Sequence, residues 1–248
     1  MSDAPSPSTA PPPASRPSPA RQVIMAMLAL VVIGGAGWNV WRQFDTPRGY
    51  RFDHSKPYPF RDDVVANATP SAEGFTGLAF VDAAGEPVDL DRYRGAKNVV
   101  LVVTRGNTSG LPPEMHTGTI CLYCASQTAR LVANYDAIAA HDAEVVVVFP
   151  VAGGADAPAL EAFRAAVAAD AARHDAKPAA AAPFPVVLDV GLAAVDRLGL
   201  RADLSRPATY VIDKEGRVRF AYVGESAADR PSVKAILGQL AGLAPKAP

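Results

Sequence analysis

The sequence has few cysteines: only two occur in 248 residues, at Cys121 and Cys124. Without a second cysteine pair, a zinc site built from four cysteines is excluded, so a metal would need histidine ligands. The chain has only four histidines, His54, His116, His141 and His174. They are spread along the sequence, so the pattern is not typical of a metal site.

An excess of positive charge is also lacking. Lys and Arg total 24, Asp and Glu total 25, and the formal net charge is −1. Without a basic field, nucleic acid is not an expected partner. The hydrophobic share of 49% and the charged share of 20% are ordinary for a globular protein, and no internal repeat is apparent.

The first 21 residues lack the apolar side chains needed for a core. Seven of the 23 prolines fall in the first 20 positions, mixed with Ser and Ala. Such a segment buries too little apolar surface to offset the entropy lost on ordering. We therefore expect residues 1–21 to form a disordered tail.

Charge is absent from the next stretch, Val23 to Trp38. Extended to Trp41, this stretch approaches the roughly 20 residues that a membrane-spanning helix needs. Both tryptophans would lie at one membrane interface, where indole rings are favoured. The pattern predicts a transmembrane helix over residues 22–41. A cleaved signal peptide is the main alternative, and a buried core helix is another.

The orientation of this span is ambiguous from charge alone. Two arginines, Arg16 and Arg21, precede it. Five basic residues follow it: Arg42, Arg48, Arg51, Lys56 and Arg61. The positive-inside rule would place the C-terminal side in the cytoplasm, but long C-terminal domains translocate largely regardless of charge. We expect a single-pass protein of a bacterial inner membrane with a periplasmic domain. Disulfides form in that compartment, and the chain has no third cysteine that could mispair with Cys121 or Cys124 there.

A proline-containing polar linker is predicted over residues 42–75, and one domain over 76–248. Apolar runs at 98–104 and 144–150 are typical of buried strands, and hairpins are expected around 82–85 and 213–216. Helical patterns occur over 121–140, 156–174 and 230–240. This order predicts an α/β fold with a mixed sheet flanked by helices.

The two cysteines lie where a loop meets the first of these helices. At a helix start, free backbone N–H groups and the helix dipole lower a thiol pKa. Cys124, one turn further, can attack a mixed disulfide formed on Cys121. The spacing therefore predicts a redox pair, with Cys121 as the nucleophile and the more exposed, more acidic thiol. A static structural disulfide and a metal site are the alternatives.

From about residue 75 to 241, the chain resembles the thioredoxin-like superfamily. It is most similar to its alkyl hydroperoxide reductase and thiol-specific antioxidant branch, the peroxiredoxin-like proteins. Four segments carry the resemblance: GEPVDLDRYRG, NVVLVVTRG, CLYCASQTARL and RPATYVIDKEGRVRFAYVG. The resemblance implies a thioredoxin-like mixed sheet.

The resemblance also implies roles for residues outside the cysteine pair. Pro207 corresponds to a proline that is cis in the superfamily, faces the Cys-x-x-Cys pair and helps to bind substrate, so we expect a cis Arg206–Pro207 bond near Cys121. Arg206 would lie close enough to favour a thiolate, with a solvated arginine as the alternative. Tyr123, between the cysteines, is similar to the tyrosine of glutaredoxins and is a third candidate substrate-binding residue.

The chain departs from the peroxiredoxin pattern before its first cysteine. Peroxiredoxins usually have Pro-x-x-x-Thr-x-x-Cys, whereas here Glu114 and Gly118 stand at the proline and threonine positions. The dithiol chemistry does not depend on that motif.

Three functions remain open on the sequence. The first is a membrane-anchored thiol–disulfide oxidoreductase with Cys121 as nucleophile and Cys124 as resolving thiol. The second is a thiol peroxidase with Cys121 as the peroxidatic cysteine. The third is a non-catalytic or metal-binding module on this fold. The first two need no cofactor, and their partners would be a disulfide or hydroperoxide substrate and a thiol redox protein.

Overall fold

The computed structural model describes residues 60–69, 75, 77–106, 120–153, 157–173, 182–202 and 204–243. They belong to one compact unit that extends from Pro57 to Pro248. The predicted tail, the predicted membrane span, most of the linker and most of the loop expected over 105–120 lie outside the described residues. Within the described ranges, no helix has both the length and the apolar character needed to cross a bilayer.

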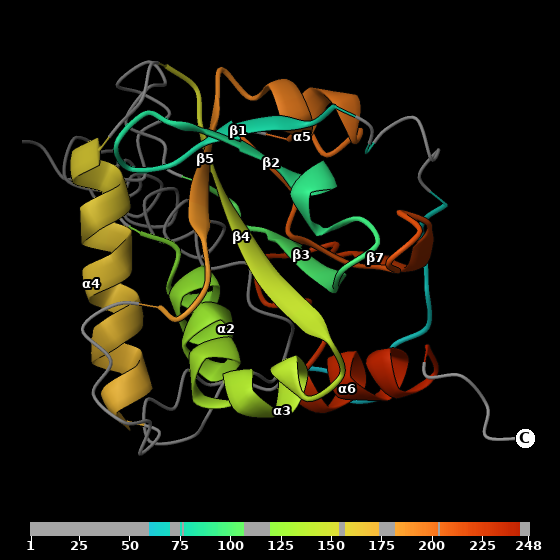
Figure 1. Cartoon of the computed structure of the whole chain (residues 1–248). Coiled ribbons are helices and arrows are strands. Elements are labelled where there is room, and N and C mark those ends of the chain that lie inside the picture. The colour runs from blue at the N-terminus through green and yellow to red at the C-terminus, as the bar shows by residue number, and fades with distance from the viewer. Residues whose placement is uncertain are drawn as a thin grey trace, which may run out of the picture. The chain divides into compact units, whose positions relative to one another are not determined.

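A seven-stranded mixed sheet forms the centre of the unit (Figure 1). Its strands lie in the order β2-β1-β5-β4-β3-β6-β7. Their bounds are β1 (Ala79–Val81), β2 (Pro87–Asp89), β3 (Asn98–Val103), β4 (Ala143–Val151), β5 (Val186–Val190), β6 (Ala208–Ile212) and β7 (Val218–Val223). β3, β4 and β5 are parallel to one another, and β1–β2, β1–β5, β3–β6 and β6–β7 pair antiparallel. The mixed sheet predicted from the sequence is confirmed.

Helices pack on both faces of this sheet (Figure 1). One face is covered by α2 (Leu122–Ala133), α3 (Tyr135–Ala139), α4 (Ala157–Arg173) and α6 (Val233–Ala241). The other face is covered by α5 (Ala193–Arg197) and the short 3-10 helix η2 (Leu90–Tyr93). The cysteine pair thus belongs to the more heavily covered face.

Strand β3 shows why the sheet needs both layers. All six of its residues are buried. Val100 and Val102 contribute to the core beneath α2 and α4, whereas Val99, Leu101 and Val103 contribute to the core beneath α5. Because successive side chains of a strand point to opposite faces, an unbroken apolar run requires cover on both sides.

The helix expected over 121–140 is divided in the structure. Asn134 separates α2 from α3, and its side-chain Nδ2 donates to the Arg130 carbonyl at 2.8 Å. An asparagine that binds a carbonyl of the last turn offers the backbone an alternative to continuing the helix. The prediction of one helix was therefore wrong at this residue.

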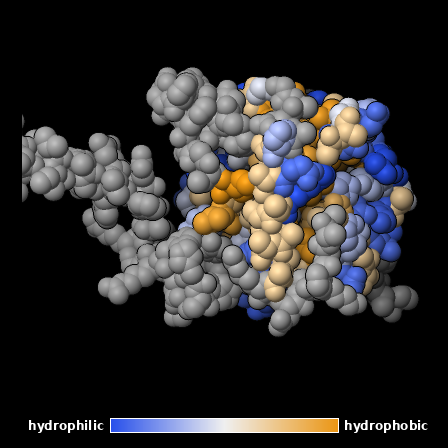
Figure 2. Space-filling model, turned by 90° about the vertical axis from the view of Figure 1, so that its left-hand side faces the viewer, coloured by the Kyte–Doolittle hydropathy of each residue, from blue (hydrophilic) through white to orange (hydrophobic). Residues whose placement is uncertain are grey.

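Helix α4 lies on the side of the molecule that faces the viewer in Figure 2. The surface there mixes weakly hydrophobic and hydrophilic residues. Glu161 and Arg164 form an ion pair of 2.9 Å on this helix, while Leu160 and Phe163 are fully buried beneath it. The helix thus uses its large apolar side chains for the core and keeps its charges outside.

An extended segment, residues 60–69, lies along the outer edge of the sheet. Asn67 in this segment forms hydrogen bonds with the backbone of the edge strand β7. The Asn67 side chain accepts from the Val223 N–H at 2.8 Å and donates to the Val223 carbonyl at 2.9 Å, and the Asn67 N–H donates to the Ala221 carbonyl at 3.1 Å. The segment therefore satisfies backbone groups that an edge strand would otherwise leave unpaired.

We predict that Asn67→Ala lowers the free energy of unfolding by about 2 kcal/mol, because it leaves the buried backbone N–H of Val223 without a partner. Asn134→Ala is the matched control: its side chain makes one exposed hydrogen bond, so its loss costs less than about 1 kcal/mol. Urea unfolding of both variants measures the difference. Equal effects of the two substitutions would contradict the role given to Asn67.

Candidate active site

Cys121 is the N-cap residue of α2. Its Sγ accepts a hydrogen bond from the backbone N–H of Cys124 at 3.3 Å. The first turn of α2 contains no acidic side chain. The sulfur of Cys121 therefore occupies the position at which an anionic cap is most favourable, at the positive end of the helix dipole.

Cys124 is the buried member of the pair. Its side chain is 1% exposed, whereas Cys121 is half-buried, and both are free thiols in the structure. The backbone N–H of Arg105, which follows β3, donates to Cys124 Sγ at 3.3 Å. The end of β3 and the start of α2 thus meet at the two sulfurs.

A buried arginine from the far end of the chain contacts both sulfurs. Arg230 is 1% exposed, and its Nη2 lies 3.1 Å from Cys124 Sγ and 3.9 Å from Cys121 Sγ. Its Nη1 donates to Gln127 Oε1 at 2.7 Å, and its Nε donates to the Ala227 carbonyl at 2.8 Å. The guanidinium is therefore held on three sides, with one side against the thiols.

The loop that carries Arg230 is tightly fixed. On its outer side, the Arg61 N–H donates to the Arg230 carbonyl at 2.9 Å, and the Ser232 N–H donates to the Arg61 carbonyl at 2.8 Å. On its inner side, a Cβ at Gly224 would collide with the Asp229 carbonyl oxygen and lie 2.9 Å from Pro207 Cγ. Only glycine allows this approach of the loop to β6.

These contacts shift the pKa values of the two thiols in opposite directions. The hydrogen bond from the Cys124 thiol, followed by the charge of Arg230, lowers the pKa of Cys121 to about 6. Burial is the main cause that raises the pKa of Cys124 well above its ordinary value. At neutral pH, Cys121 is a thiolate and Cys124 is a thiol that donates to it, which is the ionisation expected of a nucleophile and a resolving thiol.

The structure corrects the expectation for Pro207. No cis peptide bond occurs among the described residues, so the Arg206–Pro207 bond is trans. The Arg206 N–H donates to the Leu200 carbonyl, and the Gly224 N–H donates to the Pro207 carbonyl at 2.8 Å. The bond between Gly224 and Pro207 extends the pairing of β6 and β7 by one residue beyond Ala208 and Val223, while the bond to Leu200 fixes Arg206 just before it. The trans form is the intrinsically favoured one. Pro207 still lies at the sheet end where the cysteines lie, because Ala208 pairs with Val103.

Of the other two candidate residues, Arg206 directly precedes Pro207, and Tyr123 lies between the two cysteines in the chain. Arg206 is exposed, and its Nε lies 3.4 Å from the Gly224 carbonyl. The arginine that contacts the sulfurs is Arg230, which the sequence reasoning missed. Tyr123 is half-buried in the first turn of α2. Leu122, its neighbour, is 53% exposed and is one of the few large apolar side chains at the described surface.

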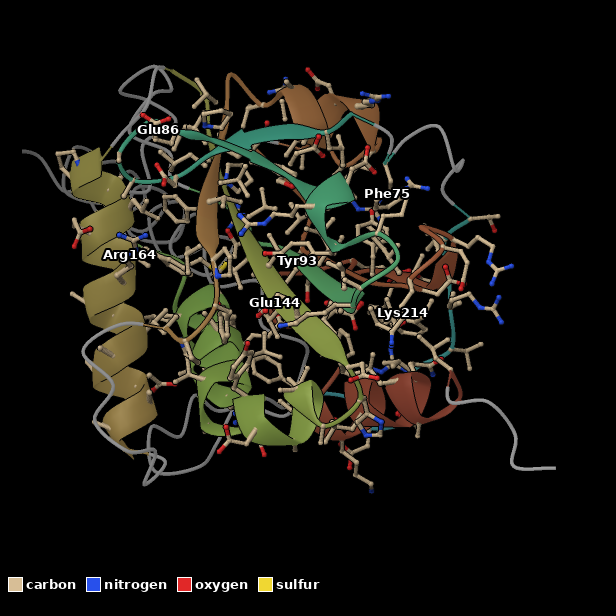
Figure 3. All side chains as sticks on the ribbon, viewed as in Figure 1. Phe75, Glu86, Tyr93, Glu144, Arg164 and Lys214 are labelled. Carbon is tan, nitrogen blue, oxygen red and sulfur yellow. The ribbon has the colours of Figure 1, made fainter. Side chains whose placement is uncertain are left out.

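A second cluster of ionisable groups lies at the opposite end of the sheet. Glu144, labelled in Figure 3, stands near the start of β4. Its carboxylate accepts from Lys97 Nζ at 2.8 Å and from the Tyr135 hydroxyl at 2.7 Å. Burial, together with that carboxylate, raises the pKa of Tyr135. Every member has a partner, which is typical of a structural network.

Metal-binding groups do not gather in the described ranges: no three His, Cys, Asp or Glu side chains there lie close enough to hold an ion.

A mixed sheet that presents a Cys-x-x-Cys pair at a helix start, against a buried cation, defines the class of thiol-dependent redox enzymes with a thioredoxin-like fold. Sequence comparison gives the family. Residues 67–221 match the AhpC/TSA family, and the chain belongs to that family. It is accordingly an antioxidant-type oxidoreductase, that is, a thiol peroxidase or a thiol–disulfide oxidoreductase.

One solved structure supports the fold, and two others are similar over much of the chain. A mutant of peroxiredoxin 6 from Arenicola marina aligns with a TM-score of 0.54 at 13% identity, over 71% of this chain and 74% of that chain. The mitochondrial 2-Cys peroxiredoxin of Plasmodium falciparum aligns with a TM-score of 0.46 at 14% identity, over 66% and 87%. A secreted Mycobacterium tuberculosis disulfide oxidoreductase, homologous to E. coli DsbE, gives 0.45 at 16% identity, over 70% and 100%. No curated protein matches the chain.

We predict that iodoacetamide labels Cys121 of the reduced protein first, with a rate that rises through an inflection near pH 6, because the pKa of this thiol is lowered to about 6. Mass spectrometry of the alkylated peptides measures the site, and the pH profile measures the pKa. The matched control is Cys121→Ser, in which only the buried Cys124 remains and labelling is slow at pH 7. Labelling of Cys124 first, or an inflection near 9, would reverse the assignment.

Proposed function

We propose that the chain is a membrane-anchored thiol–disulfide oxidoreductase. The observation that supports this most directly is the position of the two thiols. Cys121 caps α2 and is half-buried, while Cys124 lies one turn inside the helix and is 1% exposed, with its backbone nitrogen 3.3 Å from Cys121 Sγ. One sulfur is placed for attack and the other for resolution.

The chemistry follows from that placement. The Cys121 thiolate attacks one sulfur of a substrate disulfide, the substrate S–S bond breaks, and the departing thiolate takes a proton from solvent. Cys124 then loses its proton and attacks Cys121 Sγ. This releases the second substrate thiol and leaves a Cys121–Cys124 disulfide. A thiol redox partner returns the pair to its starting state, and the same steps run in reverse for substrate oxidation.

The peroxidase alternative uses the same residues. The Cys121 thiolate would attack a peroxide oxygen, the O–O bond would break, and the alcohol or water would leave with a proton. Cys124 would condense with the resulting sulfenic acid and release water. Family membership favours this reaction, and so does the cation of Arg230 beside the pair. The exposed Leu122 next to Cys121 favours a larger, partly apolar substrate such as a protein disulfide.

The anchor is proposed from the sequence. Residues 22–41 contain the apolar run between Val23 and Trp41. That run has the length and the interfacial tryptophans of a single bilayer span. Pro207, Arg206 and Tyr123 are proposed to line the approach of a substrate to Cys121, since all three belong to segments at this end of the sheet or of α2.

We predict that the detergent-solubilised full chain reduces a peptide disulfide or oxidises a peptide dithiol faster than it turns over hydrogen peroxide. Quenched-flow alkylation followed by mass spectrometry, which detects the mixed disulfide and the Cys121–Cys124 disulfide, measures the two reactions. The Cys124→Ser variant is expected to accumulate the mixed disulfide on Cys121, because the resolving thiol is gone. A peroxide rate far above the disulfide rate would establish the peroxidase alternative instead.

We predict further that the domain lies outside the cytoplasm. Protease added to intact spheroplasts is expected to degrade residues 57–248 without membrane disruption, because a long C-terminal domain translocates despite the basic residues that precede it. A cytoplasmic marker protein serves as the control for intact membranes. Protection of the domain until the membrane is broken would place it in the cytoplasm.

A further inference from the structure

The guanidinium of Arg230 is a permanent charge in a buried place. Arginine keeps its proton in proteins, so this charge cannot be removed by titration. Two of its contacts are neutral oxygens, Gln127 Oε1 at 2.7 Å and the Ala227 carbonyl at 2.8 Å. The remaining contacts are the two sulfurs, at 3.1 and 3.9 Å. Over the residues that the structure describes, no carboxylate forms an ion pair with this guanidinium.

The carboxylate next to Arg230 in sequence is engaged elsewhere. Asp229 Oδ1 accepts from the Tyr222 hydroxyl at 2.6 Å and lies 3.6 Å from Arg61 Nη1. Its Oδ2 accepts from the Glu225 N–H at 3.0 Å. The negative charge that compensates Arg230 in the described region must therefore come from the cysteine pair.

We propose that Arg230 sets the redox direction of the pair by stabilising the dithiol over the disulfide, so that the oxidised enzyme accepts electrons from substrate dithiols. The proposal rests on the thiol–disulfide function given above and assigns its substrate class. Arg230 is a catalytic residue in this scheme, because it contacts the reacting sulfurs.

The energetic reason is a change in charge. A dithiol that carries one thiolate places a negative charge beside the guanidinium, whereas a disulfide is neutral. Forming the disulfide therefore leaves a buried cation without its counter-charge, which is far more costly than leaving an exposed one. A pair whose reduced form is stabilised in this way is a strong oxidant.

The same contacts assist the individual steps. A substrate thiolate attacks Cys121 Sγ of the disulfide, since Cys124 is buried, and the S–S electron pair leaves on Cys124 Sγ. In the reduced structure that atom lies 3.1 Å from Arg230 Nη2 and 3.3 Å from the Arg105 N–H. A stabilised leaving thiolate departs faster.

The second substrate thiolate then attacks the substrate sulfur of the mixed disulfide and releases Cys121 as a thiolate. The substrate dithiol becomes a disulfide and gives up two electrons and two protons. The enzyme takes both electrons. One proton goes to Cys124, and the other goes to solvent, because Cys121 rests ionised at neutral pH.

The test is the equilibrium of the full chain, in detergent, with glutathione buffers of graded ratio, read by alkylation and mass spectrometry. Arg230→Met is expected to raise the disulfide-to-dithiol ratio at least about tenfold, equivalent to about 30 mV toward more reducing potential. Arg219→Met is the matched control. Arg219 lies on β7, is half-exposed, and has the Asp213 carboxylate 3.6 Å from its guanidinium, so its loss does not change the charge next to the cysteines. It should leave the disulfide-to-dithiol ratio within about twofold. The second control is Glu114→Gln, which removes the one carboxylate in the sequence between residues 107 and 119 and should likewise change the ratio by less than about twofold.

If Arg230→Met does not fold, urea unfolding of the unsubstituted chain in its oxidised and reduced forms tests the proposal. The oxidised protein is expected to unfold at a lower urea concentration than the reduced protein, because only the reduced form compensates Arg230. Three results would overturn the proposal. The oxidised form could resist urea better than the reduced form, or folded Arg230→Met could keep the disulfide-to-dithiol ratio unchanged. The third is a shift of that ratio with Glu114→Gln as large as the one expected of Arg230→Met. Failure of the unsubstituted chain to form a Cys121–Cys124 disulfide at all would instead overturn the proposed function itself.

Discussion

The contact between the buried guanidinium of Arg230 and the two sulfurs is the constraint on which the rest of the site depends. Gln127 on α2 binds the guanidinium, and the backbone of Arg61 in the outer segment pairs with Arg230 and Ser232. Gly224 lets the loop approach β6 closely enough to bring the arginine inward. A cation placed in the interior requires this many supports, since each missing hydrogen bond to a buried charge is costly.

The two ends of the sheet show how the same fold treats buried charge in two ways. At Glu144 the carboxylate has both Lys97 and the Tyr135 hydroxyl, and none of the three changes its charge during a thiol reaction. At Arg230 the neutral partners are fixed, but the charged partner is a thiolate whose existence depends on the redox state. A network completed by permanent partners stabilises the fold, whereas a network completed by a reactive group couples stability to chemistry.

The sequence predicted those features that depend on local pattern. The apolar run of β3, buried on both faces, and the position of Cys121 at a helix start were both readable from neighbouring residues. Arg230 was not, because it lies more than a hundred positions from the cysteines, and nothing in its local sequence marks it as buried. The trans bond before Pro207 was missed because the local sequence does not determine the isomer of an X–Pro bond, which the tertiary structure selects. Resemblance carried the expectation of a cis bond, and this chain departs from it.

In the proposed mechanism, substrate recognition and the charge balance of the cysteine pair depend on different residues. Leu122, the neighbour of the proposed nucleophile Cys121, is 53% exposed, whereas Cys124 is 1% exposed and would react only after Cys121. Arg230 is buried and lies nearer to Cys124 Sγ, the sulfur that a substrate would not contact in that mechanism. A substitution at the exposed side can therefore change which substrates reach the nucleophile without altering the charge balance of the pair. A substitution at the buried side alters the balance between dithiol and disulfide for every substrate alike, because that balance is a property of the pair and its counter-charge.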